Sequence, residues 1–426
     1  MDNVYLYFYS LVWLLTFIFF YRKKKMMDCG NFVILLFFVY SVFSIVLYKT
    51  SSDYGSHPIH FFSLIYLYLM IMLTMSPVFA YNQQKIKQIV CPNEAILDGI
   101  VIMYIVASIF SLPEDFRQIR DSLVTMVTDS SAGLDAYHEA MADSVYSLGD
   151  GRISNIPSII KNLFRNIVMV IAWYYVVTNK KKLYIYLSFS FIMVDMLLPL
   201  AKAQRGITIA ILLIFIATYF SMIKFMPSKL KKRLTVIMVA AVILLSIPFM
   251  AITHSRFDRN EGGVQSSMVT YIGQENLNFA IYGFDNNGLR YGDRVCPFLK
   301  RMLGYDNVPR NFWERRAKYP HLRINDEVFI GYVGDFVLDF GPVVSFVLFV
   351  IFTIILYPVI RIRSGTLYFH QLIALSMLLY VGTIGGLKLF PFADNGALTL
   401  ITYIIMYIVF YNGKSNRTIR LIENGK

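Results

Sequence analysis

Arginine is concentrated in the segment 254–327, whereas the short basic segments elsewhere in the chain are rich in lysine. Either cation can orient a membrane protein, but only the planar guanidinium fork grips phosphate or carboxylate in a bidentate way. The excess of arginine therefore predicts an anionic ligand at this segment. A loop held together by its own ion pairs is the alternative interpretation, because nine acidic residues accompany the nine arginines and two lysines. The arginines are Arg256, Arg259, Arg290, Arg294, Arg301, Arg310, Arg315, Arg316 and Arg323.

Arg205 stands in the short sequence KAQRG, between two apolar stretches. A charge at a membrane boundary is costly unless it is paired or useful. The second stretch is expected to begin a helix here, and the free N–H groups of its first turn would add positive potential beside the guanidinium. We therefore predict a compact anion site at Arg205. An interfacial anchor, or an ion pair with Asp195, is the alternative.

Carboxylates recur at a helical spacing where a late apolar stretch begins. Glu327, Gly331, Asp335 and Asp339 are four residues apart, so on a helix they share one face. We expect the two aspartates to act as a general base or, as we favour, as counter-ions for the arginines. The stretch 328–360 would be about 50 Å long as a helix, too long for one crossing, so its start is expected at the membrane interface.

The composition indicates that lipid surrounds most of the chain. Of the 426 residues 57% are hydrophobic and only 16% are charged, well below the roughly 25% of soluble domains. Apolar runs long enough to cross about 30 Å of hydrocarbon must be helices there. The predicted fold class is therefore all-α, a polytopic membrane protein of about 11 transmembrane helices in a single integral membrane domain, 1–426. The runs fall near 3–21, 31–48, 60–80, 95–112, 158–178, 183–201, 206–225, 234–253, 336–360, 367–388 and 396–411.

Short basic segments set the predicted orientation. The run RKKK at 22–25, the lysines at 180–182 and the basic C-terminal tail all fall on one side, which makes that side cytoplasmic. The N-terminus is then outside and the C-terminus inside. Two long loops are left outside, the acidic 113–157 and the arginine-rich 254–327, which lies between helices 8 and 9. Nucleic acid is not an expected partner, because the net charge of +13 is scattered over short loops.

Three stretches resemble one family of membrane enzymes. The sequence EVFIGYVGDFVLDFGPVVSFVLF at 327–349 is similar to the segment that leads into a late helix of O-antigen polymerases, the Wzy-type oligosaccharide repeat unit polymerases. QRGITIAILLIFI at 204–216 resembles the Arg-Gly start of their mid-chain helix, and YIGQENLNF at 271–279 resembles a stretch of their long periplasmic loop. Length, number of spans and position of the long loop also agree.

The resemblance implies a glycosyltransferase of the bacterial inner (cytoplasmic) membrane, with the N-terminus and the long loops in the periplasm. Its substrate would be an undecaprenyl-diphosphate-linked oligosaccharide. A terminal hydroxyl of one lipid-linked unit attacks the anomeric carbon of the growing chain, and the lipid diphosphate leaves. A chain-length regulator and other polysaccharide-assembly proteins are the implied partners, besides the lipid bilayer, and no cofactor or metal is implied.

The same resemblance assigns roles to the residues singled out above. Arginines can stabilise the charge that develops on a departing diphosphate, and a carboxylate or imidazole can take the hydroxyl proton. The residues predicted to bind diphosphate and glycan are Arg205, Arg290, Arg294 and Arg323. The candidate bases are Asp335, Asp339 and His321. His321 has no second ligand at metal spacing, so no metal site is predicted there.

Two other functions stay open at this point. An O-antigen ligase has a similar architecture and also breaks the bond between sugar and diphosphate, but it transfers the glycan to a lipid A core. A lipid-linked oligosaccharide flippase is less favoured, because a transporter would show more even loops, charges within the spans and a repeat between halves.

Overall fold

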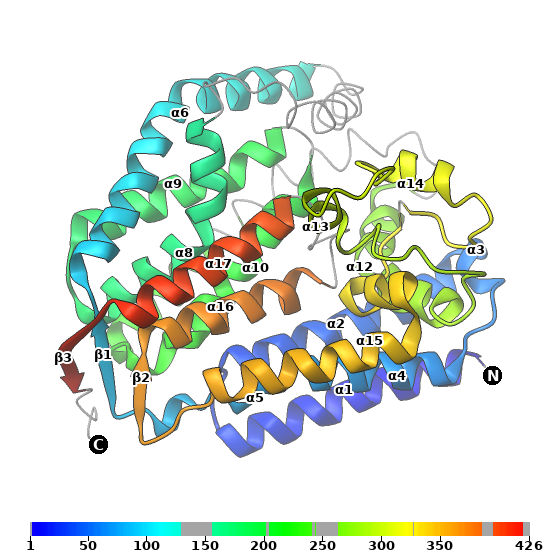
Figure 1. Ribbon diagram of the computed structural model, residues 1–426, viewed down its shortest axis with the longest axis horizontal. Helices are drawn as coiled ribbons and strands as arrows, with labels where there is room; N and C mark the ends of the chain where they lie inside the picture. Colours follow the sequence, from blue (N-terminus) through cyan, green and yellow to red (C-terminus); the bar gives the residue numbers. More distant parts are fainter. Residues whose placement is uncertain are drawn as a thin grey trace. The chain divides into compact units, whose positions relative to one another are not determined.

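The structure, a computed structural model, describes residues 2–128, 156–201, 204–240, 243, 263–326, 328–385 and 395–420. Over these residues the chain is nearly all α-helix, with one small sheet (Figure 1). Seven of the described helices are long and apolar enough to cross a membrane. A pair bent by 50°, α4 (Phe61–Thr74) with α5 (Ser76–Ala80), would make an eighth. The chain is thus a multi-pass membrane protein, as its composition predicts.

Helices occur at the predicted apolar runs that the structure describes. The seven candidate spans are α1 (Asp2–Lys24), α2 (Cys29–Thr50), α6 (Glu94–Thr128), α8 (Ile156–Thr178), α9 (Lys182–Ala201), α10 (Arg205–Met222) and α15 (Gly331–Ile360). The last two runs form shorter apolar helices, α16 (Phe369–Ile384) and α17 (Asn395–Asn412). Most of the run 234–253 lies outside the described residues, so the count of eleven spans stays a prediction.

The described helices pack into two compact units. Unit 1 contains α1, α2, α4, α5 and α15, together with helices from the arginine-rich segment. Unit 2 contains α6, α8, α9 and α10 with the small sheet. The helices α16 and α17 are divided between the two. The predicted single membrane domain, 1–426, therefore contains two packing units.

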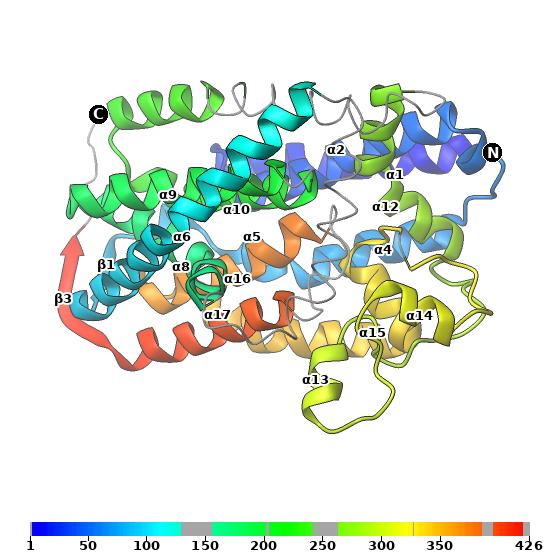
Figure 2. The ribbon, with the colours of Figure 1, turned by 90° about the horizontal axis from the view of Figure 1, so that it is seen from above.

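Aromatic side chains form the centre of unit 1, where α1 packs on α2 and α15 packs on α4 (Figure 1, Figure 2). Trp13 is fully buried, stacks on Phe37 at 5.2 Å between ring centroids and meets Tyr68 edge-on at 4.9 Å. Such ring pairs add to the stabilisation that burial alone provides. The buried carboxylate of Asp28 caps the start of α2 and pairs with Lys24 at 2.6 Å, which closes the turn from α1.

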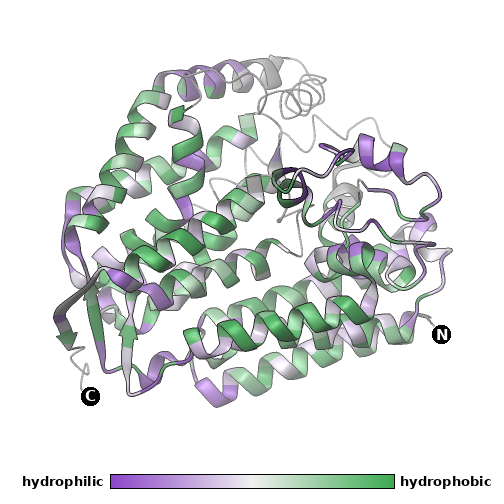
Figure 3. Cartoon of the chain, in the orientation of Figure 1, coloured by the Kyte–Doolittle hydropathy of each residue, from purple (hydrophilic) through white to green (hydrophobic). Residues whose placement is uncertain are grey.

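The arginine-rich segment 254–327 contains helices and is not a plain loop. They are α12 (Gly263–Tyr282), α13 (Pro297–Met302) and α14 (Phe312–Lys318). Helix α12 packs through polar groups, because Asn276 accepts from Tyr9 Oη at 3.1 Å and donates to Ser44 Oγ at 3.0 Å. Hydrophobic periodicity could not predict a helix whose buried residues are polar and apolar in turn, such as Asn276, Leu277 and Asn278. Figure 3 shows hydrophilic residues gathered around α14 and hydrophobic ones along α15.

Helix α15 is kinked at Gly341, whose φ of 77° lies in the left-handed region that favours glycine. Pro342 follows, and proline cannot donate a helical hydrogen bond. The part from the kink to Ile360 covers about 28 Å as a helix, close to the thickness of the hydrocarbon. The part before the kink is therefore not needed to cross the membrane, in agreement with the prediction that 328–360 is too long for one span.

In unit 2, Trp173 of α8 packs against α9 and α10, its ring lying 4.9 Å from Phe189, 5.1 Å from Phe215 and 5.2 Å from Tyr219 between centroids, and α6 packs on α8 and α9. Helix α6 continues beyond the predicted end of its apolar run, through Pro113 to residue 128. The first part of the predicted acidic loop 113–157 is thus helical, and residues 129–155 lie outside the described part of the chain.

A three-stranded sheet joins the ends of helices in unit 2. Strand β1 (Gln88–Pro92) lies in the middle, parallel to β2 (Thr366–Tyr368) and antiparallel to β3 (Lys414–Arg420). In the register Val90 faces Tyr368 on one side and Thr418 on the other. The sequence predicts only basic loops and a tail here, because strands this short and polar have too few residues to show an alternating pattern.

Candidate functional site

The kink in α15 positions one loop of the arginine-rich segment. In an unbroken helix the Leu338 carbonyl would accept from residue 342, but Pro342 has no N–H. Arg290 N donates to that carbonyl instead, at 3.1 Å. Tyr291 N donates to the Asp339 carbonyl at 3.0 Å. The two carbonyls that the kink exposes therefore fasten the loop 290–295 to α15.

The side chain of Asp339 strengthens the same attachment. Its carboxylate is fully buried and accepts from Arg294 N at 3.1 Å and from Val295 N at 2.6 Å. Hydrogen bonds from amides to an ionised acceptor are stronger than neutral ones. Because Asp339 has no exposed surface, a substrate hydroxyl could reach it only if the loop 290–295 moved. Its role as general base stays a prediction.

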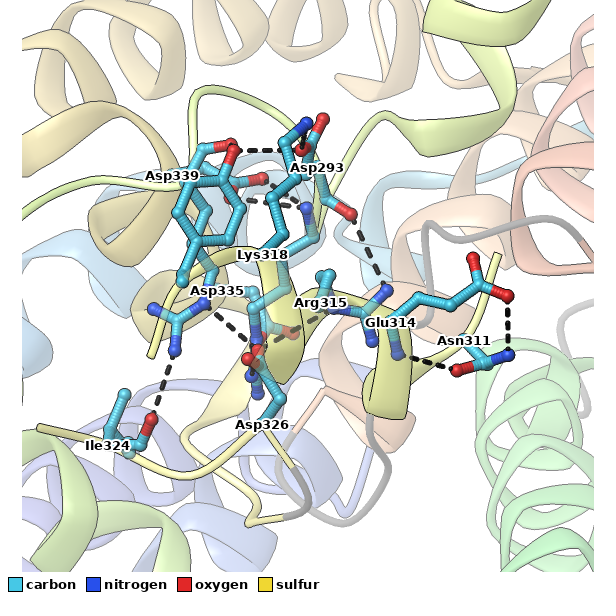
Figure 4. A network of polar contacts seen from close by, with 12 residues as sticks. Asp293, Asn311, Glu314, Arg315, Lys318, Ile324, Asp326, Asp335 and Asp339 are labelled. Carbon is cyan, nitrogen blue, oxygen red and sulfur yellow. Dashed lines mark hydrogen bonds and ion pairs between the residues drawn. The ribbon is translucent and has the colours of Figure 1, made fainter. Parts of the chain in front are cut away.

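Arg294 is the centre of a buried ionic cluster in unit 1, which Figure 4 shows from close by. Its side chain has no exposed surface, and Nε lies 2.6 Å from Asp335 while Nη1 lies 3.0 Å from Asp326. The remaining nitrogen, Nη2, donates to the Val328 carbonyl at 3.2 Å. Burial works to lower the pKa of Arg294, but the charges of Asp335 and Asp326 outweigh it and raise that pKa. Asp335 is thus the counter-ion of an arginine in this structure.

Two further arginines share the carboxylate of Asp326. Its Oδ1 atom lies 2.9 Å from Arg290 Nε and 3.6 Å from Arg315 Nε, besides its contact with Arg294. Burial and the nearby charge of Arg294 lower the pKa of Arg315 to about 10, which still leaves it charged at neutral pH. Arg290 Nη1 is buried and has no hydrogen-bond partner among the described residues. Three guanidinium groups thus share Asp326, and Asp335 and Asp339 are the other two carboxylates of the cluster.

Asp293 ties α13 and α14 to the same loop. Its carboxylate pairs with Lys300 of α13, and it accepts from Lys318 of α14 at 2.7 Å and from Tyr319 Oη at 2.8 Å. Burial opposes ionisation, but the hydrogen bonds from Lys300, Lys318 and Tyr319 prevail and hold the pKa of Asp293 below its ordinary value. We call the segment 285–330 the cap, because these contacts fold it onto the start of α15.

An open pocket of about 200 Å³ borders the buried cluster. The residues that line it include Arg316, Tyr319, Leu322, Arg323, Ile324 and Asp326. Arg323 has 57% of its side chain exposed and pairs with the equally accessible Asp285. Arg290 Nη2 donates to the Ile324 carbonyl at 3.1 Å, so the buried guanidinium groups support one wall of the pocket. The accessible Arg316 and Arg323 thus line the pocket, and Ile324 and Asp326 link its wall to the buried arginines.

The structure brings most of the predicted site residues of this segment together. Arg290, Arg294, Asp335 and Asp339 belong to the buried cluster. Arg323 lines the pocket, and His321 is exposed beside it, with its carbonyl accepting from Asn287 Nδ2 at 3.0 Å and its ring 6.5 Å from that of Tyr319.

Arg205 belongs to unit 2 and is the first residue of α10, at the predicted start of that helix. Its side chain lies outside the described part of the chain, so the predicted anion site at this residue is not described. The N-cap residue, Gln204, makes no side-chain hydrogen bond to the helix. The role of Arg205 stays a prediction.

Sequence reasoning did not single out Asp326, Asp293 or Arg315 as parts of a site. Asp326 contacts Arg294 although 32 residues separate them in the sequence. A local sequence pattern cannot predict a contact between residues so far apart. The signal that could have indicated an attached loop is the dipeptide at 341–342, since glycine followed by proline interrupts a helix and frees carbonyl groups for other donors.

Unit 2 holds a second buried group of charges, which links three of its apolar helices. Lys161 of α8 lies 2.5 Å from Asp115 of α6 and 3.2 Å from Asp195 of α9. Tyr104 Oη donates to Asp195 at 3.0 Å, and Arg165 lies 4.0 Å away from it. Asp195, which the sequence offers as a partner for Arg205, therefore already has a lysine and a tyrosine as partners. Ionisable residues at such positions are retained only when they are paired.

Comparison with protein-family models, with curated proteins and with solved structures finds no match for this chain. Within the described residues no three His, Cys, Asp or Glu side chains lie close enough together to hold a metal ion.

Proposed function

We propose that the chain is a glycosyltransferase that polymerises undecaprenyl-diphosphate-linked glycan repeat units, of an O-antigen or of a capsular polysaccharide or exopolysaccharide. The observation that carries the proposal is the cationic cap at the start of α15. Three buried guanidinium groups surround Asp326 beside a pocket whose edge carries the exposed Arg316 and Arg323. A departing diphosphate gains charge in the transition state, and preorganised arginines stabilise it.

The energetics of the ion pairs separate two kinds of arginine. Breaking a buried pair by removing one partner costs about 3–5 kcal/mol, whereas an exposed pair contributes about 0–1 kcal/mol. An incoming diphosphate can thus displace Asp285 from Arg323 with little loss of free energy. Displacing Asp335 from Arg294 would cost several times more. We therefore assign substrate contact to Arg323 and Arg316. Arg294 and Arg290 would hold the pocket in position.

The proposed step is a displacement at the anomeric carbon. The hydroxyl oxygen of one lipid-linked unit forms a bond to that carbon, the bond from the carbon to the diphosphate oxygen breaks, and undecaprenyl diphosphate leaves with the bonding electron pair. The hydroxyl proton passes to a base. Of the three candidate bases His321 is exposed beside the pocket, whereas Asp335 and Asp339 are buried and engaged. His321 is our first choice.

The orientation belongs to the same proposal. The chain would lie in the bacterial inner membrane with eleven spans, the N-terminus and the cap in the periplasm and the C-terminus in the cytoplasm. Support comes from the basic residues in the last turn of α1 and directly after α15, since short basic segments favour the cytoplasmic side. It also comes from the resemblance to O-antigen polymerases at 204–216, 271–279 and 327–349.

Deleting the gene tests the function by what accumulates. Without a polymerase, single repeat units still cross the membrane and are still ligated, so lipopolysaccharide should show one core-plus-one band in place of a ladder. For a capsule, the long polymer should vanish while single lipid-linked units persist. Long chains that persist on the lipid carrier would make the chain a ligase, and the absence of any repeat unit at the outer face would make it a flippase.

Paired substitutions test the site within that function. Arg316→Gln with Arg323→Gln should lower polymerisation by at least about 10²-fold, since loss of one such donor typically costs 10²–10³. Arg310→Gln is the matched control, because Arg310 is an exposed arginine of the same cap that does not line the pocket. Protein levels in the membrane must be equal. Equal effects of the pair and the control would refute the assignment of the pocket.

A further inference from the structure

Helix α13 and the turn after it expose a group of apolar side chains. Leu299, Met302, Leu303 and Tyr305 are each more than half exposed. They lie within nine residues of sequence, 297–305, that also contain two basic residues and no acidic one. Scattered exposed apolar residues are ordinary on any protein, but a contiguous group of large ones marks an interaction surface.

The position of this group within unit 1 indicates which environment it contacts. The loop 290–295 is hydrogen-bonded to α15 at Leu338 and Asp339, immediately before the kink. Figure 2 shows α13 projecting past α15 on the side opposite α1 and α2. After the kink α15 exposes Val343, Val344 and Val347, the surface that a membrane span offers to lipid. The exposed residues of α13 thus lie at the level where the lipid-facing surface of α15 begins.

The chemistry of the group matches a membrane interface. Aliphatic side chains insert at the boundary of the acyl chains, aromatic ones sit among the headgroups, and Lys or Arg contacts lipid phosphate. Here Leu299, Met302 and Leu303 are the aliphatic residues and Tyr305 is the aromatic one. Arg301, which also donates to the Pro309 carbonyl at 3.3 Å, is the arginine. Lys300 pairs with Asp293, which fixes α13 to the loop 290–295 of the cap.

We propose that residues 297–305 form an interfacial anchor, which lies in the headgroup region of the leaflet at the outer end of α15. The occupant of this surface is phospholipid. The anchor would hold the cap, and with it the pocket at Arg316 and Arg323, at a fixed height above the membrane. The inference does not depend on the proposed glycosyl transfer, because any reaction at the cap would keep the same anchor.

A spin label measures the depth of the anchor directly. The background is Cys296→Ser, since the other two cysteines, Cys29 and Cys91, are buried. Labels are placed at Leu303→Cys and, in a second protein, at Met302→Cys, so that one failed variant does not decide the outcome. The matched control is Ala317→Cys on α14, an exposed position of the same cap. The full chain is studied in nanodiscs of phosphatidylethanolamine and phosphatidylglycerol.

Power saturation then compares collisions with oxygen, which concentrates in lipid, and with a nickel chelate, which stays in water. The labels at 302 and 303 should favour oxygen, and the label at 317 should favour nickel. Equal access of nickel to 303 and 317 would overturn the anchor. Protection of 302 and 303 from both reagents would overturn it as well, because it would mean that a protein or a second copy of the chain covers the surface.

Discussion

Arg294 and Asp335 form an ion pair with no more than a trace of exposed surface, Nε lying 2.6 Å from Oδ1, although 41 residues separate them in the chain. The pair joins the cap to α15. Each charge has lost its water, so each depends on the other for its solvation. The attachment of the cap therefore depends on this pair more than on the exposed ion pairs of the same segment.

Removing the Arg294 charge should destabilise the protein strongly. We expect Arg294→Gln to lower the free energy of unfolding by about 3–5 kcal/mol, because it leaves Asp335 buried without its counter-ion. The matched control is Arg323→Gln, which breaks an exposed pair and should cost less than about 1 kcal/mol. Denaturant unfolding of both variants in the same detergent measures the difference. Losses of similar size would show that the buried pair is not the attachment described above.

Glu275 of α12 should make stability fall as the pH rises. Its side chain is buried, Oε2 has no hydrogen-bond partner among the described residues, and burial, with a smaller effect of the Asp335 charge, raises its pKa well above the ordinary value. The folded protein then keeps a proton that the unfolded chain releases above about pH 4.3. The stability is fully present below that pH and is lost as pH rises towards the folded pKa, by about 1.4 kcal/mol per pH unit.

Glu275→Gln tests this directly, since glutamine mimics the protonated carboxyl group. The variant should match the parent protein near pH 4 and be more stable at pH 8, with a flatter dependence of the melting temperature on pH. Parallel pH profiles of the two proteins would mean that Glu275 is ionised in the folded state and has a partner.

The membrane helices could be predicted from the sequence because the hydrophobic signal is local. A run such as 31–48 must be a helix in lipid whatever its neighbours are, and α2 occupies it. The spacing of Asp335 and Asp339 also predicted counter-ions for arginines, and Asp335 pairs with Arg294, whereas Asp339 accepts from the backbone amides of Arg294 and Val295. It could not predict which arginine, because the choice of Arg294 depends on the kink at Gly341 and on contacts over 41 residues.

Polar packing accounts for most of what the sequence did not predict. Asn276 of α12 is hydrogen-bonded to Tyr9 and to Ser44, which holds the helix in place. Polar residues of this kind in a hydropathy profile indicate a loop. The charges of Lys161 and Asp195 in unit 2 likewise interrupt apolar runs, yet they form a pair at 3.2 Å. In each case the partner is far away in sequence, and only folding brings the two together.

Arg205 offers a test that is independent of the cap. Arg205→Ala should lower polymerisation by roughly 10²–10³-fold if the guanidinium stabilises the departing diphosphate. Arg205→Lys should restore activity only in part, since lysine lacks the bidentate fork. The measurement is the length distribution of the glycan at equal protein levels. Full activity of Arg205→Lys would mean that charge alone suffices.

The orientation of unit 1 decides whether the cap can meet a lipid-linked glycan at all. Helix α1 ends in Arg22, Lys23 and Lys24, and Arg361 follows α15, so these ends should be cytoplasmic and the cap periplasmic. Reporters that work only in the periplasm should be active when fused near residues 140 and 290. Near residue 230, a reporter that works only in the cytoplasm should be active, and a periplasmic reporter should be inactive. A cytoplasmic signal at 290 would place Arg316 and Arg323 on the wrong side of the membrane for the proposed transfer. The glycosyltransferase proposal would then fail. The buried ion pair of Arg294 and Asp335 does not depend on the orientation and would still hold.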